Sequence, residues 1–169
     1  MDKLSKEEFE VKYNLYSQEL MNISYGYTKD RDDSFDVIQN VFYKYFNSNK
    51  TFLNQNEEKY WLIRVTINEC KDLLRQKKKT TVIDEKSIDS FVEADDNNSK
   101  DPRLDKLSML VKELPEKYRV AIILHYYDSL PIKDISKALN ASESSIKKRL
   151  ERARNMLKER MGGALVRCT

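Results

Sequence analysis

Basic and hydroxyl side chains are concentrated between Ser142 and Arg160, at a spacing that suits contact with a polyanion. If this segment is a helix, Ile146, Leu150, Ala153 and Leu157 fall on one side of it. The opposite side then carries Ser144, Ser145, Lys148, Glu151 and Arg152, surrounded by the cations Lys147, Arg149, Arg154, Lys158 and Arg160. Lysine and arginine bind phosphates, and small hydroxyl residues let a helix end approach base edges. The pattern favours nucleic-acid binding; a solvated helix with ordinary surface charges is the alternative.

The residues before this segment predict a shorter amphipathic helix. Ile132, Ile135 and Leu139 recur at the spacing of one apolar stripe. Asn140 follows where the chain must turn, and asparagine tolerates the left-handed backbone conformation. Ser142 is a suitable N-cap, so the second helix is expected to begin at about Glu143. Two such helices with a tight break between them have the layout of a helix-turn-helix.

Charge is unevenly distributed along the 169 residues. Charged residues make up 35% of the chain and only 3 residues are glycine, which favours an α-rich protein over a β-sandwich or barrel. The formal net charge is only +3. However, Arg75 and Lys77–Lys79 form one basic block and the last helix forms another, whereas residues 84–101 are acidic. Two basic patches separated by an acidic connector predict two contacts on one polyanion.

Residue types that usually bind metals or perform catalysis are sparse. His125 is the only histidine, and Cys70 and Cys168 lie far apart without the spacing of metal ligands, so no metal or other cofactor is expected. Cys70 lies in an apolar helical pattern and is interpreted as a small core residue. Since a glycine-rich phosphate loop and a nucleophile motif are also lacking, the chain is not expected to be an enzyme.

Membrane insertion and export are not predicted either. The longest apolar runs fall short of the roughly 20 residues that a membrane-spanning helix needs. The N-terminal sequence MDKLSKEEFE lacks the hydrophobic part of a signal peptide. These features predict a cytoplasmic protein.

Three amphipathic helices are predicted within residues 1–79, from about Ser5 to Thr28, Asp33 to Asn47 and Glu58 to Lys78. The expected core residues of the second helix are Phe35, Ile38, Val41, Phe42, Tyr45 and Phe46. Those of the third are Trp61, Val65, Ile67, Cys70, Leu73 and Leu74. The other face of the second helix carries Asp36, Gln39, Asn40 and Tyr43, and is either plain solvent surface or a docking site. A loop of a dozen residues is expected between the second and third helices, which is longer than a connection in a helical bundle requires.

An all-α protein with two small domains follows from this reading. Residues 80–103 are predicted to be an acidic linker, because apolar residues there are scattered among Asp, Glu, Asn and Ser. Residues 104–161 are predicted to hold four helices, of which the first ends and the second begins at Leu114-Pro115. The second helix has the expected stripe Tyr118, Ala121, Ile122 and Tyr126, and a turn at Asp128-Ser129 leads into the helix-turn-helix. Residues 162–169 form a tail.

With these elements placed, the chain resembles the sigma-70-type initiation factors of RNA polymerase, and within them the extracytoplasmic-function (ECF) group. The family signature D-x-x-D-φ-φ-Q-x-x-F, where φ is apolar, is matched by Asp33–Phe42. A W-L-x-x-I-x-x-N-x-x-x-D-x-x-R pattern is matched from Trp61 to Arg75, with Val65 in place of Ile. Further matches are L-P-x-x-x-R at Leu114–Arg119 and T-V-K-x-R-φ-x-R-A-R at Ser145–Arg154. The resemblance covers about 13–79 and 107–158.

The resemblance implies a binding role for the polar face of the second helix, for the third helix with the loop before it, and for the last helix. The positions that match the polymerase-docking surface, which grips the β′ clamp helices, are Asp36, Gln39, Asn40 and Tyr43, with Asn40 in place of the commoner Glu. The positions that match the reader of the minus-ten promoter element are Asn68, Lys71, Asp72 and Arg75, and Lys78 is assigned with them. The loop before the third helix corresponds to one that holds a flipped base. The positions that match the reader of the minus-thirty-five element are Ser144, Ser145, Lys147, Lys148, Arg149 and Arg152. The turn at Asp128-Ser129 lacks the family's usual glycine.

By this resemblance the chain is expected to bind core RNA polymerase, to recognise promoter DNA through both domains and to promote strand opening. An anti-sigma factor is an expected further partner. The alternative is a stand-alone helix-turn-helix transcriptional regulator, which would need no docking surface around Asp36 and Gln39.

Overall fold

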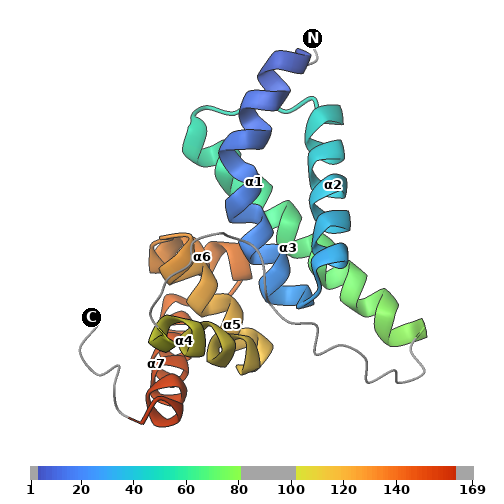
Figure 1. The fold of residues 1–169 in the computed structure, drawn as a ribbon. Helices are drawn as coiled ribbons and strands as arrows, with labels where there is room; N and C mark the ends of the chain where they lie inside the picture. Colours follow the sequence, from blue (N-terminus) through green and yellow to red (C-terminus); the bar gives the residue numbers. More distant parts are fainter. Residues whose placement is uncertain (1–3, 81–101, 163–169) are drawn as a thin grey trace. The chain divides into compact units, whose positions relative to one another are not determined.

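The computed structural model describes residues 4–80 and 102–162, which form two compact helical units (Figure 1). The acidic linker apart from its ends, the tail from residue 163 onward and Cys168 lie outside the described residues. All regular elements in the described ranges are helices, as the sequence predicts. None of these helices combines the length and the apolar character that crossing a bilayer requires.

The first unit consists of three helices, α1 (Lys6–Thr28), α2 (Arg31–Asn47) and α3 (Gln55–Thr80), each packed against the other two. Ser5 caps α1 through a reciprocal pair with Glu8, in which each backbone N–H donates to the other residue's side chain. The Asp30 carboxylate caps α2 by accepting from the Asp33 N–H at 2.9 Å. Each predicted helix is therefore present, with a capping group at its start.

The third helix begins earlier than the sequence predicts. The Asn54 side chain accepts from the Glu57 N–H at 2.9 Å, and the Glu58 N–H donates to the Asn54 carbonyl at 3.2 Å. Asn54 therefore starts the helix one turn before Glu58, because an asparagine side chain satisfies an N–H that the first turn leaves without a partner. The connection from α2 is only 48–54, so the predicted dozen-residue loop was too long.

Phe35 does not belong to the core, contrary to the sequence prediction. Its side chain is 42% exposed, and the Arg31 guanidinium lies 5.6 Å from its ring centroid. At about 100° per residue, Phe35 lies about 120° from the buried Val41, while Val37 takes a core position that the prediction omitted. Tyr13 of α1 is also exposed, at 39%, although one side of its ring packs on Phe42 at 4.7 Å between centroids.

A buried carboxylate joins all three helices of this unit. Glu58 of α3 is 6% exposed and accepts hydrogen bonds from Lys12 Nζ at 2.7 Å, Tyr16 Oη at 2.9 Å and Tyr45 Oη at 2.5 Å. Burial by itself raises the pKa of Glu58, but the hydrogen bonds from Lys12, Tyr45 and Tyr16 outweigh it and lower this pKa below its ordinary value. Burial and the same hydrogen bonds raise the pKa of both tyrosines. Glu58 thus stays ionised, and the tyrosines stay neutral donors.

We predict that Glu58→Gln destabilises the first unit by about 1.5 to 3 kcal/mol at neutral pH, since it removes a charged acceptor from buried donors. Because the folded-state pKa of Glu58 is lowered, its stabilising contribution is present above the unfolded-state pKa and is lost as pH falls through the folded-state value. The difference between wild type and variant should therefore shrink in acid. Denaturant unfolding followed by fluorescence of Trp61, the chain's only tryptophan, reports on this unit alone.

The matched control is Glu10→Gln, a change of the same chemistry on the exposed side of α1. It should alter the unfolding free energy by no more than about 0.5 kcal/mol at any pH. Equal effects of the two variants would show that the contacts of Glu58 add nothing to stability.

The second unit contains α4 (Pro102–Glu113), α5 (Glu116–Ile122), a π-helical turn η1 (Ile123–Tyr127), α6 (Ile132–Leu139) and α7 (Glu143–Arg160). The last helix packs on α4 and α5, burying Ile146, Leu150, Ala153 and Leu157 as predicted. Arg119, from the L-P-x-x-x-R motif, is only 5% exposed and donates to the Leu114 carbonyl at 2.6 Å. This motif arginine therefore holds the end of α4 against α5.

The π-helical turn changes which side chains reach the core. The Asp128 N–H donates to the Ile123 carbonyl five residues back at 3.0 Å, which places one extra residue in the turn. Tyr126, predicted as part of the buried stripe, is consequently 48% exposed, while Leu124 is fully buried. Ser129 then has a φ of 56°, the left-handed region in which glycine is the least strained residue.

Candidate functional site

The helix-turn-helix forms where the sequence predicts it. Asn140 has a φ of 52°, so the chain turns through the left-handed region at this residue. The Ser142 hydroxyl accepts from the Ser145 N–H at 3.1 Å and starts α7 at Glu143. The Ser136 hydroxyl of α6 donates to the Ala141 carbonyl, which ties the turn to the helix before it. These local hydrogen bonds fix the start of α7.

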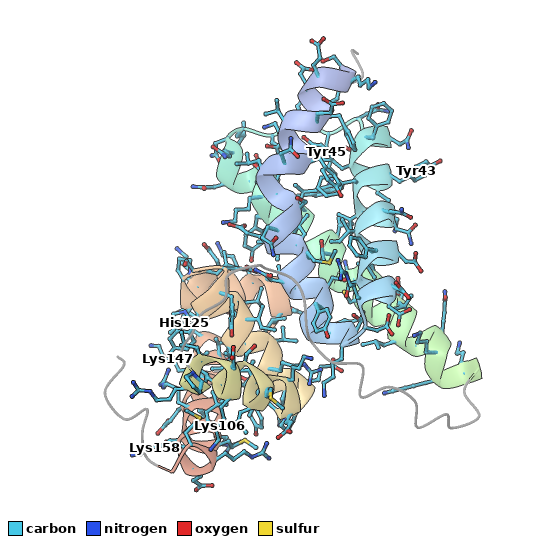
Figure 2. All side chains as sticks on the ribbon, in the orientation of Figure 1. Tyr43, Tyr45, Lys106, His125, Lys147 and Lys158 are labelled. Carbon is cyan, nitrogen blue, oxygen red and sulfur yellow. The ribbon has the colours of Figure 1, made fainter. Side chains whose placement is uncertain are left out.

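All six predicted reading residues of α7 lie away from its buried stripe. Ser144, Lys147, Lys148 and Arg152 are exposed, and Ser145 and Arg149 are half-buried. At about 100° per residue, one flank of the helix carries Ser145, Lys148, Arg149 and Arg152. Lys147 lies on the opposite flank together with Arg154 and Lys158; Lys147 and Lys158 are labelled in Figure 2. The predicted set is thus divided between two edges of one helix.

Tyrosines from two preceding elements interact with basic side chains near α7. Arg154 Nη1 donates to the Tyr126 hydroxyl at 3.1 Å. The positively charged side chains of Arg152 and Lys117 lower the pKa of Tyr118, although partial desolvation opposes the shift. The Lys117 ammonium lies 5.0 Å from the centroid of the Tyr118 ring. The tyrosines were treated only as apolar stripe residues in the sequence, which gave no sign of these contacts.

A second basic surface lies on α3. Asn68, Lys71, Asp72 and Arg75 are all exposed and line one shallow groove with Lys44, Val65 and Glu69. Arg75 Nη1 lies 3.6 Å from Asp72 Oδ1, an exposed i,i+3 pair that contributes little to stability. Lys78 is exposed one turn beyond Arg75. The structure therefore brings the first four predicted residues together and places Lys78 at the end of the same helix.

The polar face of α2 is fully exposed. Asp36, Gln39, Asn40 and Tyr43 all project into solvent, and Tyr43 is 72% exposed. Figure 2 shows Tyr43 pointing away from the bundle, whereas Tyr45, two residues on, points between the helices. Phe35 lies on the same face and was missed. The sequence could have placed Phe35 on this face, because Phe35 lies outside the apolar stripe once Val37 is included in it. That stripe consists of Val37, Ile38, Val41, Phe42 and Tyr45.

The loop between α2 and α3 presents an aromatic pair at the start of α3. Phe52 and Trp61 have ring centroids 5.8 Å apart, and the Lys50 ammonium lies 5.6 Å from the Trp61 ring. Leu53 is 91% exposed. A cation, aromatic rings and an exposed apolar side chain are features that unstacked bases can bind.

Comparison with known proteins identifies both units. Residues 13–80 match the family model of sigma-70 region 2, and residues 104–157 match that of sigma-70 region 4. The ECF RNA polymerase sigma factor SigM of Bacillus subtilis (strain 168) is 30% identical over 148 residues, covering 86% of this chain and 90% of SigM. SigV of the same strain, an RNA polymerase sigma factor, is 27% identical over 143 residues, with 85% and 84% covered.

Solved structures have the same fold. The sigma factor RpoE of Bartonella quintana, in complex with the anti-sigma factor NepR, aligns with a TM-score of 0.70 at 21% identity, covering 93% of this chain and 98% of RpoE. CnrH, in complex with the cytosolic domain of CnrY, aligns with a TM-score of 0.65 at 18% identity, over 95% and 91%.

The fold and the two exposed basic helices thus define a two-module transcription-initiation factor. The chain belongs to the sigma-70 family, in its ECF group, and is an alternative sigma factor. The predicted family and fold class are confirmed. A stand-alone helix-turn-helix regulator would account for the region 4 match and leave the region 2 match unexplained.

We predict that Ser142→Ala destabilises α7 by about 1 kcal/mol, because the Ser145 N–H loses its acceptor in the first turn. Thermal unfolding followed by circular dichroism measures the loss. Ser144→Ala is the matched control, because it makes the same substitution at an exposed serine two residues later. This variant should leave the melting temperature unchanged. If both variants melted like wild type, the cap would contribute nothing to the start of α7.

Proposed function

We propose that α2 binds core RNA polymerase, that α3 contacts the minus-ten promoter element and that α7 reads the minus-thirty-five element. The observation that carries this proposal is that the residues matching each family role lie outside the buried stripe, on one helix per role, and all but Ser145 and Arg149 are exposed. We place region 2 at 1–79, the linker at 80–103, region 4 at 104–161 and the tail at 162–169. The end of α3 at Thr80 and the start of α4 at Pro102 support these boundaries.

The docking surface proposed on α2 comprises Asp36, Gln39, Asn40 and Tyr43, with Phe35 added from the structure. Its partner is the pair of clamp helices in the β′ subunit. Only Asp36 carries charge within this set, because Asn40 replaces the commoner Glu. Exposed aromatic side chains are enriched among the residues that dominate interface energies. Tyr43 and Phe35 therefore supply apolar contact area around a polar centre.

We predict that Tyr43→Ala weakens binding to core polymerase by about 1 to 2 kcal/mol, because an exposed aromatic anchor is removed without disturbing the core. Fluorescence anisotropy of the labelled chain, titrated with core polymerase, measures the affinity. Gln39→Ala should weaken binding in the same direction. Gln18→Ala, an exposed glutamine on α1, is the control and should bind as wild type does. Unchanged binding of both α2 variants would remove this face from the interface.

We further propose that α3 and the preceding loop act together at the start site. Asn68, Lys71, Asp72, Arg75 and Lys78 contact the minus-ten element, and the loop from 48 to 54 holds a base that has left the duplex. Capture of a flipped base costs a few kcal/mol of unstacking, which binding must repay. The aromatic pair of Phe52 and Trp61, with Lys50 beside it, provides a surface for such a base.

Recognition of the upstream element is proposed for Ser144, Ser145, Lys147, Lys148, Arg149 and Arg152. Arginine is the side chain best suited to guanine, since its guanidinium can donate two parallel hydrogen bonds to O6 and N7. Arg149 is half-buried on the flank that also carries Arg152. This partial burial restricts the side chain, which favours a directed contact with a base edge over a diffuse contact with phosphates.

We predict that Arg149→Ala relaxes sequence preference at one or two positions of the upstream element, at a cost of about 1 to 3 kcal/mol on the preferred promoter. Transcription by the reconstituted holoenzyme across a promoter library measures this preference. Lys158→Ala, on the opposite flank, should weaken all promoters about equally. A library profile of Arg149→Ala identical to that of wild type would show that Arg149 reads no base.

Regulation by an anti-sigma factor is proposed as well. RpoE and CnrH, which have this fold, were each solved with an anti-sigma partner or a partner's cytosolic domain. We propose that such a partner binds this chain in the cytoplasm, and that the chain performs no catalysis itself. Affinity purification of the tagged chain from unstressed cells tests the partner: recovery of a protein that blocks promoter binding supports it, and recovery of core polymerase alone contradicts it.

A further inference from the structure

The basic end of α3 extends beyond the packed part of region 2. The residues that follow the half-buried Leu74, Arg75–Lys79, are all exposed, and Figure 1 shows this end of α3 running past the start of α2. Exposed turns gain no stability from packing, and helix ends fray. Like charges three or four residues apart, such as Arg75 and Lys79, also repel each other. The helix dipole offsets only part of this repulsion.

The start of α2 supplies a contact to this basic end. The Lys77 ammonium donates to Asp33 Oδ2, and this ion pair joins the first turn of α2 to the last turns of α3. The Asp33 side chain is only 17% exposed, and the first turn of a helix favours a negative charge. Partial burial reduces screening by water and salt, so this pair contributes more than a fully exposed one.

Two neighbouring lysines of α3 face in different directions. At about 100° per residue, Lys77 lies about 20° from the buried Cys70 around the helix axis, so it continues the buried side of α3. Lys78 lies about 60° from Arg75, which lines the groove of the proposed promoter surface. Lys77 therefore faces α2, and Lys78 faces the side that is proposed to meet DNA.

We propose that Asp33 is a positioning residue which, through Lys77, keeps the end of α3 helical and so holds Arg75 and Lys78 toward promoter DNA. The inference rests on the proposed contact of α3 with the minus-ten element. It gives the first aspartate of the D-x-x-D signature a role apart from polymerase docking, which is proposed for Asp36. It also assigns the charge of Lys77 to a contact within the protein.

The first test compares promoter binding by two variants of the full chain, each assembled into holoenzyme with saturating core polymerase. Asp33→Asn raises the net charge by one, so simple attraction to DNA would tighten binding. We expect binding about two- to fivefold weaker instead, the range for loss of one partly exposed ion pair. Asp32→Asn makes the same charge change at an exposed residue of the same helical turn, and should bind no more weakly than wild type.

Amide hydrogen exchange of the full chain gives a second readout that needs no DNA. Asp33→Asn should increase the exchange rates of the amides from Gln76 to Lys79 about two- to fivefold, with the rest of α3 unchanged. Lys77→Gln removes the other partner and should have the same effect. Asp33→Glu keeps the carboxylate and should restore most of the wild-type protection, whereas Asp32→Asn should exchange as wild type does.

A double-mutant cycle shows whether Asp33 acts through the two proposed DNA contacts. If it does, Asp33→Asn has no further effect on promoter binding once Arg75→Ala and Lys78→Ala are both present. Promoter binding by Asp33→Asn as tight as that of Asp32→Asn, or unchanged exchange at residues 76–79, would overturn the positioning role. Wild-type promoter binding by the chain carrying Arg75→Ala and Lys78→Ala would instead contradict the contact of α3 in the proposed function.

Discussion

The ionised carboxylate of Glu58 is the interaction on which the geometry of region 2 depends. Its partners come from α1 and α2, so one buried charge on α3 meets donors from both other helices. An apolar contact tolerates rotation or sliding of a helix, but hydrogen bonds to a buried charge do not, because a lost donor leaves the charge uncompensated. The contact therefore fixes α2 and α3 relative to each other. The proposed docking face of α2 and the groove on α3 are both exposed on this fixed frame.

Region 4 obtains much of its geometry from local backbone contacts. Arg119 binds the last carbonyl before Pro115, Ser142 caps α7, and the left-handed residues Ser129 and Asn140 set the two turns. Each contact spans only a few residues of sequence. Such contacts fix where a helix starts, and the buried stripe of α7 then fixes which edge faces solvent. In this way local contacts set where α7 begins, and its packing on α4 and α5 sets which edge faces solvent.

Features that depend on residues close together in the sequence were predicted correctly, and features that depend on contacts between distant residues were not. Helix number, the Ser142 cap and the left-handed Asn140 depend on neighbouring residues, and all three were predicted correctly. Phe35 was misassigned because an apolar type was taken as evidence of burial, although its angular position excludes it from the stripe. Glu58 lies 46 residues from Lys12 and 42 from Tyr16, so its role depends on tertiary contacts that periodicity does not contain. Tyr126 was misplaced for a third reason, since an α-helical period does not anticipate the extra residue of η1.

That extra residue has a structural consequence for the whole of region 4. A regular helix in its place would rotate every following side chain by about 100°, which would carry Tyr126 toward the interior and separate its phenol from Arg154. It would also redirect the chain that enters α6, because the Leu130 N–H donates back to the Leu124 carbonyl across this turn. Insertion or deletion of one amino acid at Ile123–Tyr127 is thus a change of helical phase, a single-residue length change that would reorient α6 and α7 without altering any residue that is proposed to contact DNA.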